Sequence, residues 1–150
     1  MGYNFGVGRE APTFTLSAAD GNEISLQQYR GDWFPVLVFL PSASAGAGDA
    51  LAGLSAAADT LWGLRGQLLG LCDTGVDALR ELARSTEGLS FPLLADDGAV
   101  AQAYGALKPS GELRPMVFVV DRSGKIVWTG EGAEALVPDA LVAAFREVVR

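Results

Sequence analysis

Two short segments that are apolar on both faces most constrain the fold of this chain. Residues 36–40 read VLVFL and residues 67–71 read QLLGL, a composition typical of strands buried inside a sheet. Between them, from Asp49 to about Arg65, apolar residues recur at three- and four-residue spacing, which predicts an amphipathic helix. A buried strand, a helix and a second buried strand in this order predict a sheet that is covered by helices.

The remaining periodic segments complete one domain. An N-terminal strand and a turn at 20–23 predict a hairpin, and Ser25 is placed to cap a helical turn that Gly31 ends. The other predicted elements are helices at 76–85, 100–104 and 138–149, an extended segment at 91–95, and a hairpin of 116–120 with 126–129. A chain of 150 residues, of which 49% are hydrophobic, suits a single domain over residues 1–150. The predicted fold class is α/β, with a mixed central sheet and helices on both faces.

The residue inventory excludes several kinds of chemistry. The chain has no histidine, so it can build neither a Ser-His-Asp or Cys-His nucleophile nor a histidine-ligated metal site. Its single cysteine, Cys72, excludes an intramolecular disulfide, a CxxC redox pair and a cysteine-cluster metal site. We therefore expect no metal and no cofactor.

The net charge and the hydropathy of the chain argue against nucleic acids and membranes as partners. With 11 Lys and Arg against 18 Asp and Glu, the net charge is −7, which argues against nucleic acid or an anionic membrane surface. The longest strictly apolar run, Phe34 to Pro41, is far shorter than the ~20 residues that cross a bilayer. Residues Met1 to Gly6 lack the basic and apolar regions of a secretory signal. We therefore expect a cytoplasmic protein.

Four motifs in a fixed order resemble those of a known family. Gly8 to Leu16 reads GREAPTFTL, Ser25 to Gly31 reads SLQQYRG, Val36 to Pro41 reads VLVFLP, and Phe118 to Ile126 reads FVVDRSGKI. Together they resemble the GxxAPxFxL, SLxxxxG, VLxFxP and FVIDxxGxI motifs of the peroxiredoxin family (alkyl hydroperoxide reductase/thiol-specific antioxidant type) of the thioredoxin superfamily. The resemblance covers nearly the whole chain and implies a thioredoxin-like fold.

The resemblance implies an active site where the 36–40 strand ends, but the side chains of the family's chemistry are absent there. Counted from Pro41, the family's threonine falls on Ala45 and its peroxidatic cysteine on Gly48, while its arginine falls on Pro115. Glycine has no thiolate that could attack a peroxide. We therefore expect cysteine peroxidase activity to be absent. The expected function is to bind or transform a small molecule in the old cleft by non-thiol chemistry.

The candidate site residues surround that position. A glycine-rich turn into a helix offers backbone N–H groups and a partial positive charge to a carboxylate, phosphate or enolate oxygen. The candidates for catalysis are Ser42, Ser44 and Arg114, with Asp49 and Tyr104 as further tools. The predicted ligand-binding residues are Ser42, Ser44, Gly46, Ala47, Gly48, Asp49, Arg114 and Pro115. The alternative stays open that this segment is a structural remnant, in which Asp49 and the serines only cap the helix.

Other interpretations also stay open. Cys72 ends the second buried strand and could replace the lost nucleophile of a thiol-dependent antioxidant or oxidoreductase, although a lone cysteine there is commonly a small buried hydrophobe. Alternatively, the chain is a non-catalytic interaction module, with a homodimer as one form. The resemblance to thioredoxins also predicts a cis peptide bond between Arg114 and Pro115. The bias toward Ala, Gly, Leu and Arg is typical of a GC-rich bacterial source.

Tryptophans and turn carboxylates have simpler interpretations. Trp62 fits the apolar stripe of the 49–65 helix and is expected in the core. Trp33 is expected to be a pocket wall or an interface residue, of which we prefer the interface. The acidic residues in turns or near the last helix are expected to be solvated caps; they are Asp20, Asp96, Asp97, Asp121, Glu131 and Glu134.

Overall fold

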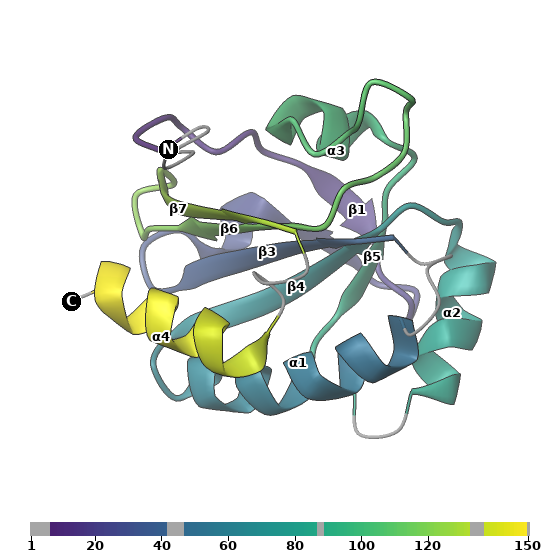
Figure 1. Ribbon diagram of the computed structural model, residues 1–150, viewed down its shortest axis with the longest axis horizontal. Helices are drawn as coiled ribbons and strands as arrows, with labels where there is room; N and C mark the ends of the chain where they lie inside the picture. The colour runs from purple at the N-terminus through teal and green to yellow at the C-terminus, as the bar shows by residue number, and fades with distance from the viewer. Residues whose placement is uncertain (1–6, 42–46, 87–88, 133–136, 150) are drawn as a thin grey trace.

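The computed structural model describes residues 7–41, 47–86, 89–132 and 137–149 (Figure 1). Its centre is a five-stranded sheet in the order β5 (Leu93–Ala95), β4 (Gly66–Cys72), β3 (Phe34–Leu40), β6 (Met116–Val120) and β7 (Ile126–Glu131). β3 and β5 each pair in parallel with β4, whereas β6 is antiparallel to both β3 and β7. The predicted mixed sheet is confirmed, and the apolar segment 36–40 lies in its central strand.

Helices cover both faces of this sheet. One face carries α1 (Ala47–Trp62), α2 (Val76–Ser85) and α4 (Pro138–Val148), and the other carries α3 (Ala99–Tyr104) and the 3-10 helix η1 (Leu26–Tyr29) (Figure 1). A separate two-stranded hairpin is formed by β1 (Thr15–Ser17) and β2 (Glu23–Ser25). None of the helices in the described ranges is long and apolar enough to span a bilayer.

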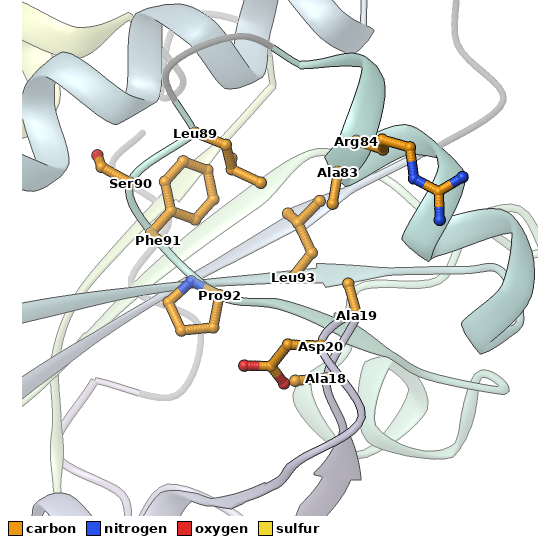
Figure 2. A pocket seen from close by; sticks show the side chains of 10 residues that line it. All are labelled: Ala18, Ala19, Asp20, Ala83, Arg84, Leu89, Ser90, Phe91, Pro92 and Leu93. Atoms are coloured by element: carbon orange, nitrogen blue, oxygen red, sulfur yellow. The ribbon is translucent and has the colours of Figure 1, made fainter.

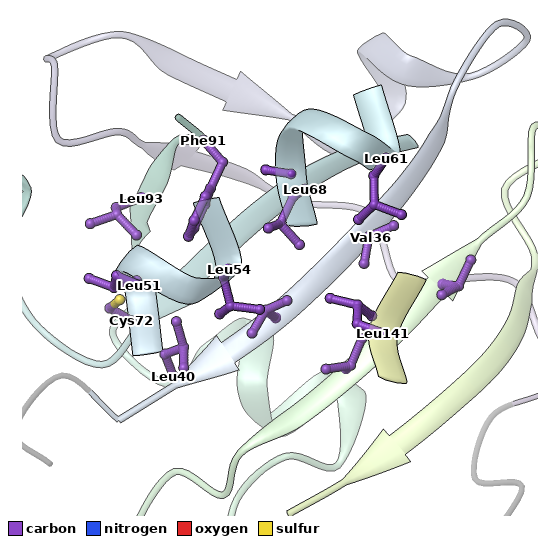
Figure 3. Packing of buried hydrophobic residues seen from close by; sticks show 14 of the residues in the cluster. Val36, Leu40, Leu51, Leu54, Leu61, Leu68, Cys72, Phe91, Leu93 and Leu141 are labelled. Carbon is purple, nitrogen blue, oxygen red and sulfur yellow. The ribbon is translucent and has the colours of Figure 1, made fainter. Parts of the chain in front are cut away.

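The alternation of side chains along β3 divides the core into two clusters. Val36 and Val38 belong to the cluster packed against α1, α2 and α4, which we call the α1-side cluster. Leu37 and Phe39 belong to the cluster packed against α3, which we call the α3-side cluster. Figure 3 shows the first of these, with leucines of α1 lying over Val36. Truncating one such buried side chain costs about 2–5 kcal/mol, so the middle of β3 tolerates little change.

β4 begins at a glycine because two helices come close to the strand there. Gly66 pairs with Phe34 in the parallel ladder. A Cβ on Gly66 would lie 2.7 Å from Cζ of Phe145 on α4 and 3.2 Å from Cβ of Leu61 on α1. Any larger residue at this position would therefore require the Phe145 ring or its helix to shift.

Turn residues act as the sequence predicts. Ser25 begins η1 in a capping box, in which its backbone N–H donates to Oε1 of Gln28 at 3.0 Å. The buried Asp96 carboxylate accepts backbone N–H groups from the first turn of α3, including that of Ala101 at 2.9 Å. Similar backbone hydrogen bonds are accepted by Asp20, Asp97 and Asp121, which confirms the capping role of these carboxylates. The expected solvation of Asp96 is wrong, because its side chain is buried under the start of α3.

One N-terminal segment is bonded to both outer strands of the sheet. Near its start, Glu10 forms an antiparallel bridge with Lys125, beside the first residue of β7. Further along, Ala18 forms a bridge with Leu94 of β5, and the backbone N–H of Ala19 donates to the carbonyl of Leu93 at 2.9 Å. Between these points the segment crosses the face that carries α3 (Figure 1).

The expected burial of Trp62 is wrong. Its side chain is 61% exposed, although its neighbour Leu61 is fully buried. Trp62 is the last residue of α1, and one residue of helix turns the side chain by about 100°, away from the sheet. Its ring lies instead against that of Trp33, with the ring centroids 5.8 Å apart.

Candidate functional site

The candidate site lies at the edge of the sheet where β3 ends. Leu40, the last residue of β3, pairs with Cys72 at the end of β4, and Phe39 pairs with Met116 at the start of β6. The ends of β3 and β4 and the start of β6 therefore share one edge. From this edge the chain runs on to α1, which begins at Ala47.

The predicted ligand-binding residues fall partly within the described structure. Ser42, Ser44 and Gly46 lie outside the described residues, and their roles stay predictions. Ala47, Gly48 and Asp49 form the first turn of α1, a helix of 16 residues. The first N–H groups of such a helix have no partner within the helix, and its dipole favours a negative charge. The position that aligns with the family's cysteine is thus at a helix N-terminus.

Arg114 reaches the same end of the sheet from the segment before β6. Its backbone N–H donates to the carbonyl of Ala106 at 2.8 Å, which fixes the start of the strand. Its guanidinium Nη1 binds Oε1 of Glu131 at 3.0 Å, in an ion pair of which the arginine side chain is 27% exposed. Its Nε atom is buried and has no hydrogen-bond partner among the described residues. The described residues therefore leave this buried donor unsatisfied.

The ion pair with Glu131 places Arg114 relative to the sheet. Glu131 pairs in register with Met116, whose side chain belongs to the α3-side cluster. Paired residues of adjacent strands point to the same face, so the ion pair lies on the α3 side of the sheet edge. α1 begins on the opposite face of the sheet. The end of the sheet therefore lies between the Arg114–Glu131 ion pair and the N-terminus of α1.

The predicted cis peptide bond at Pro115 is wrong. The described residues contain no cis peptide bond, so Arg114 is joined to Pro115 in the trans form. In this form the carbonyl of Pro115 accepts a hydrogen bond from the backbone N–H of Gly132 at 2.8 Å, which extends the ladder of β6 and β7 by one step. The trans bond thus satisfies the backbone, and trans is the favoured form of a peptide bond before proline.

Cys72 lies at the predicted sheet edge but is not accessible. Its side chain is 1% exposed and belongs to the α1-side cluster, where Figure 3 shows it beside Leu51. Burial, together with the smaller effect of the neighbouring Asp73 charge, raises the pKa of its thiol to about 12. A thiol protonated at neutral pH and enclosed by leucines is a poor nucleophile, because the thiolate is the reactive form.

Tyr104, considered as a further catalytic tool, is a core residue. Its ring is 1% exposed and packs against those of Phe39 and Phe118, with centroids 5.6 and 5.0 Å away. Its hydroxyl donates to the carbonyl of Pro12 at 2.6 Å, and burial raises its pKa. A buried tyrosine with a satisfied hydroxyl holds the N-terminal segment in place and does not reach a ligand.

Sequence reasoning missed the partner of Arg114. Glu131 was expected to be a solvated cap, and Glu134 lies outside the described residues. The register of the 116–131 hairpin contains the missing signal, because it places residue 131 opposite residue 116 and thus close to Arg114. Among the described residues, no group of three or more acidic or cysteine side chains is arranged to hold a metal ion.

Three hollows formed by described residues lie on the β5 side of the sheet, two of them at the edge where β4 ends. One, of about 590 Å³, lies between α2 and the β1–β2 turn, with an apolar floor that includes Phe91 and Leu93 (Figure 2). The other two, of about 530 and 430 Å³, share Asp73, Asp96 and Asp97. The acidic lining of this pair suits an anionic ligand poorly.

Comparisons with known proteins agree on a family. The AhpC/TSA family matches residues 7–129 of the chain. Rv2521 of Mycobacterium tuberculosis, which is named as a peroxiredoxin, is 37% identical over 135 residues, covering 80% of this chain and 81% of the relative. Alkyl hydroperoxide reductase E of the same organism is 35% identical over 140 residues, with the same coverage.

Solved structures agree with the fold. Peroxidoxin BcpB from Mycobacterium tuberculosis superposes with a TM-score of 0.83 at 22% identity, covering 97% of this chain and 99% of that one. Xanthomonas campestris peroxiredoxin Q gives a TM-score of 0.81 at 20% identity, covering 91% and 92% of the two chains. The arrangement of five strands between two layers of helices is therefore that of the thioredoxin-like fold.

Proposed function

Because the chain belongs to the AhpC/TSA family of peroxiredoxins, we propose that it binds or converts a small molecule at the family's active-site edge without thiol chemistry. The proposal rests on the two positions that could supply a thiol. Position 48 is a glycine in the first turn of α1. Cys72 is buried, with its pKa raised to about 12. Neither position offers a thiolate at neutral pH.

The ligand class follows from the groups at that edge. Arg114 offers a partly exposed guanidinium, and α1 offers N-terminal N–H groups from the other face of the sheet. A ligand with a carboxylate or phosphate group lying across the end of the sheet would meet both donors. Glu131 offsets part of the arginine charge and holds its orientation, which favours a compact ligand with a single acidic group.

The chemistry open to such a site is electrostatic. Backbone N–H groups and a guanidinium stabilise an oxyanion, and the hydroxyls of Ser42 and Ser44 could relay a proton. These groups suit proton transfer, isomerisation or hydrolysis, and none of them exchanges electrons with a peroxide.

A binding experiment tests the ligand class. Wild type and Arg114→Ala would be titrated calorimetrically with inorganic phosphate, acetate, pyruvate and benzoate. We expect at least one anion to bind wild type and its affinity to fall at least about tenfold in Arg114→Ala, because a charge-assisted hydrogen bond is lost. Arg146→Ala, which removes an exposed arginine of α4, is the matched control. Equal affinities of the two variants, or no binding by wild type, would contradict the proposal.

A peroxidase assay tests the absence of thiol chemistry. Wild type and Cys72→Ser would be supplied with hydrogen peroxide and dithiothreitol, and peroxide consumption would be followed. We expect both to match the protein-free background, because the one thiol is enclosed in the core. Consumption by wild type that disappears in Cys72→Ser would replace this proposal with the thiol-dependent alternative.

A further inference from the structure

An exposed aromatic surface lies at the opposite end of β3 from the proposed ligand site. We call it the tryptophan patch and define it by Trp33, Asp59, Trp62, Leu64 and Arg65. Trp62 is 61% exposed and Leu64 is 36% exposed, while Trp33 is half-buried. Exposed tryptophans with a neighbouring arginine are the composition of association surfaces in proteins.

The patch is ordered before any partner binds. Two rings form its centre, because Trp33 lies against Trp62 with centroids 5.8 Å apart. The guanidinium carbon of Arg65 lies over the Trp33 ring, 5.8 Å from its centroid. The backbone of Arg65 is left-handed, with a φ of 70°, and its carbonyl accepts the N–H of Phe34 at 2.8 Å. A surface fixed in this way loses little conformational entropy on association.

The patch carries one negative and one positive side chain, Asp59 and Arg65, so two copies of it can pair opposite charges. Asp59 precedes Trp62 by three residues and so lies on the same face of α1, and Arg65 follows Trp62 by three residues. Both charged side chains are exposed, and neither has an ion-pair partner in the part of the chain that the structure describes. A two-fold axis through the tryptophans would set Asp59 of each copy against Arg65 of the other.

From this arrangement we propose that the tryptophan patch is the surface through which two copies of this chain associate as a symmetric dimer. A second copy fits better than an unrelated partner because the patch carries both charges, with the aromatic pair between them. A purely basic partner would pair only with Asp59, and a purely acidic partner would pair only with Arg65. The proposal is independent of the ligand site, which lies at the other end of β3.

Sedimentation equilibrium of the full chain over a wide concentration range measures the association directly. We expect wild type to dimerise reversibly, and Trp62→Ala to weaken the dimer at least about 30-fold, since a central tryptophan dominates the energy of an interface. A wild-type chain that stays monomeric into the millimolar range would overturn the proposal. So would a dimer that Trp62→Ala leaves unchanged, because the contact would then lie elsewhere.

A charge exchange tests the symmetric pairing. Asp59→Arg alone and Arg65→Asp alone should each weaken the dimer at least about tenfold, because each sets like charges against each other. The double variant, Asp59→Arg with Arg65→Asp, restores opposite charges and should return the dissociation constant to within about threefold of wild type. Aspartate tolerates the left-handed backbone at position 65, so the exchange leaves the fold intact.

Matched controls separate pairing from net charge. Asp77→Arg and Arg84→Asp make the same two changes on α2, where both side chains are exposed. They should leave the dissociation constant unchanged, and melting temperatures would confirm that every variant is folded. If the double variant at positions 59 and 65 stays as weak as the single variants, the proposed symmetric pairing is wrong.

Discussion

The two ends of β3 differ in what their residues do. At its start, Trp33 lies on the surface against Trp62, and Arg65 lies over it. At its end, the neighbouring strand finishes in a buried thiol, and the first turn of the next helix carries glycine where the family has cysteine. Between the ends, the side chains of β3 are fully buried on both faces of the sheet.

This contrast indicates which positions are free to acquire or lose a function. The middle of β3 supports two core clusters at once, so a change there disturbs both faces. Residues beyond either end of the strand contribute less to packing. A catalytic side chain can be absent from one end, and a contact surface can be present at the other, while the fold stays the same.

The largest expected effect comes from placing a thiol at the end of β3. In Gly48→Cys combined with Cys72→Ser, the new thiol stands at the N-terminus of α1, where the helix dipole lowers its pKa. We expect iodoacetamide to label it at neutral pH at least about tenfold faster than Cys72 in wild type, because Cys72 is buried and protonated. Mass spectrometry of the alkylated protein measures the rates. Equal rates would show that this end of the strand no longer provides a reactive position.

Gly66→Ala tests how tightly the start of β3 is held. The added methyl would lie 2.7 Å from Phe145, so we expect a loss of about 1–3 kcal/mol in the free energy of unfolding. Urea denaturation followed by circular dichroism measures it. Gly75→Ala is the matched control, because a Cβ on Gly75 has no atom within 4 Å. If both variants are equally stable, the start of the strand is as loosely packed as a surface turn.

The pH dependence of stability reports on the buried end of β4. Burial raises the pKa of Cys72 from 9.0 to about 12, so the thiol ionises more readily in the unfolded chain than in the folded one. Its contribution to stability is therefore complete below pH 9 and is lost as the pH rises toward about 12, by at most about 1.4 kcal/mol per pH unit. The advantage of wild type over Cys72→Ser in urea denaturation should shrink between about pH 8 and about pH 10.5. A constant difference would mean that the thiol is accessible.

The smallest expected effect is that of Arg65→Gly on stability. Glycine relieves the left-handed backbone, which costs an ordinary residue about 1–2 kcal/mol. It also loses about 0.5–1 kcal/mol of backbone entropy and about 0.5–1 kcal/mol of cation–π contact with Trp33. We expect these terms to cancel to within about 0.5 kcal/mol, while dimerisation weakens. A large destabilisation in urea would show that Arg65 serves the fold of its own chain instead of the association surface.

The sequence was sufficient to predict the strands and helices that bury a face. The bounds of α2 and β6 are those predicted, because a strong period and a turn residue mark each end. The order of the elements and the four motifs also predicted the mixed sheet. These features depend on local sequence patterns, which can be recognised without knowledge of how the elements pack.

Features that depend on how the elements meet could not be predicted. The helical period places Trp62 in the core, yet α1 ends there and the ring turns away from the sheet. The hairpin register, which no residue type reveals, brings Glu131 to Arg114. The resemblance to thioredoxins suggested a cis bond at Pro115, but the trans form completes the ladder of β6 and β7.

The N-terminal segment that bonds to both outer strands has a consequence for the life of the protein in a cell. One stretch of chain occupies backbone groups beside β7 and along β5. Loss of this whole segment through Ala19 would therefore uncover pairing groups on both sides of the sheet together. Exposed strand edges promote cross-β aggregation, so this one segment protects the protein against polymerisation in two directions.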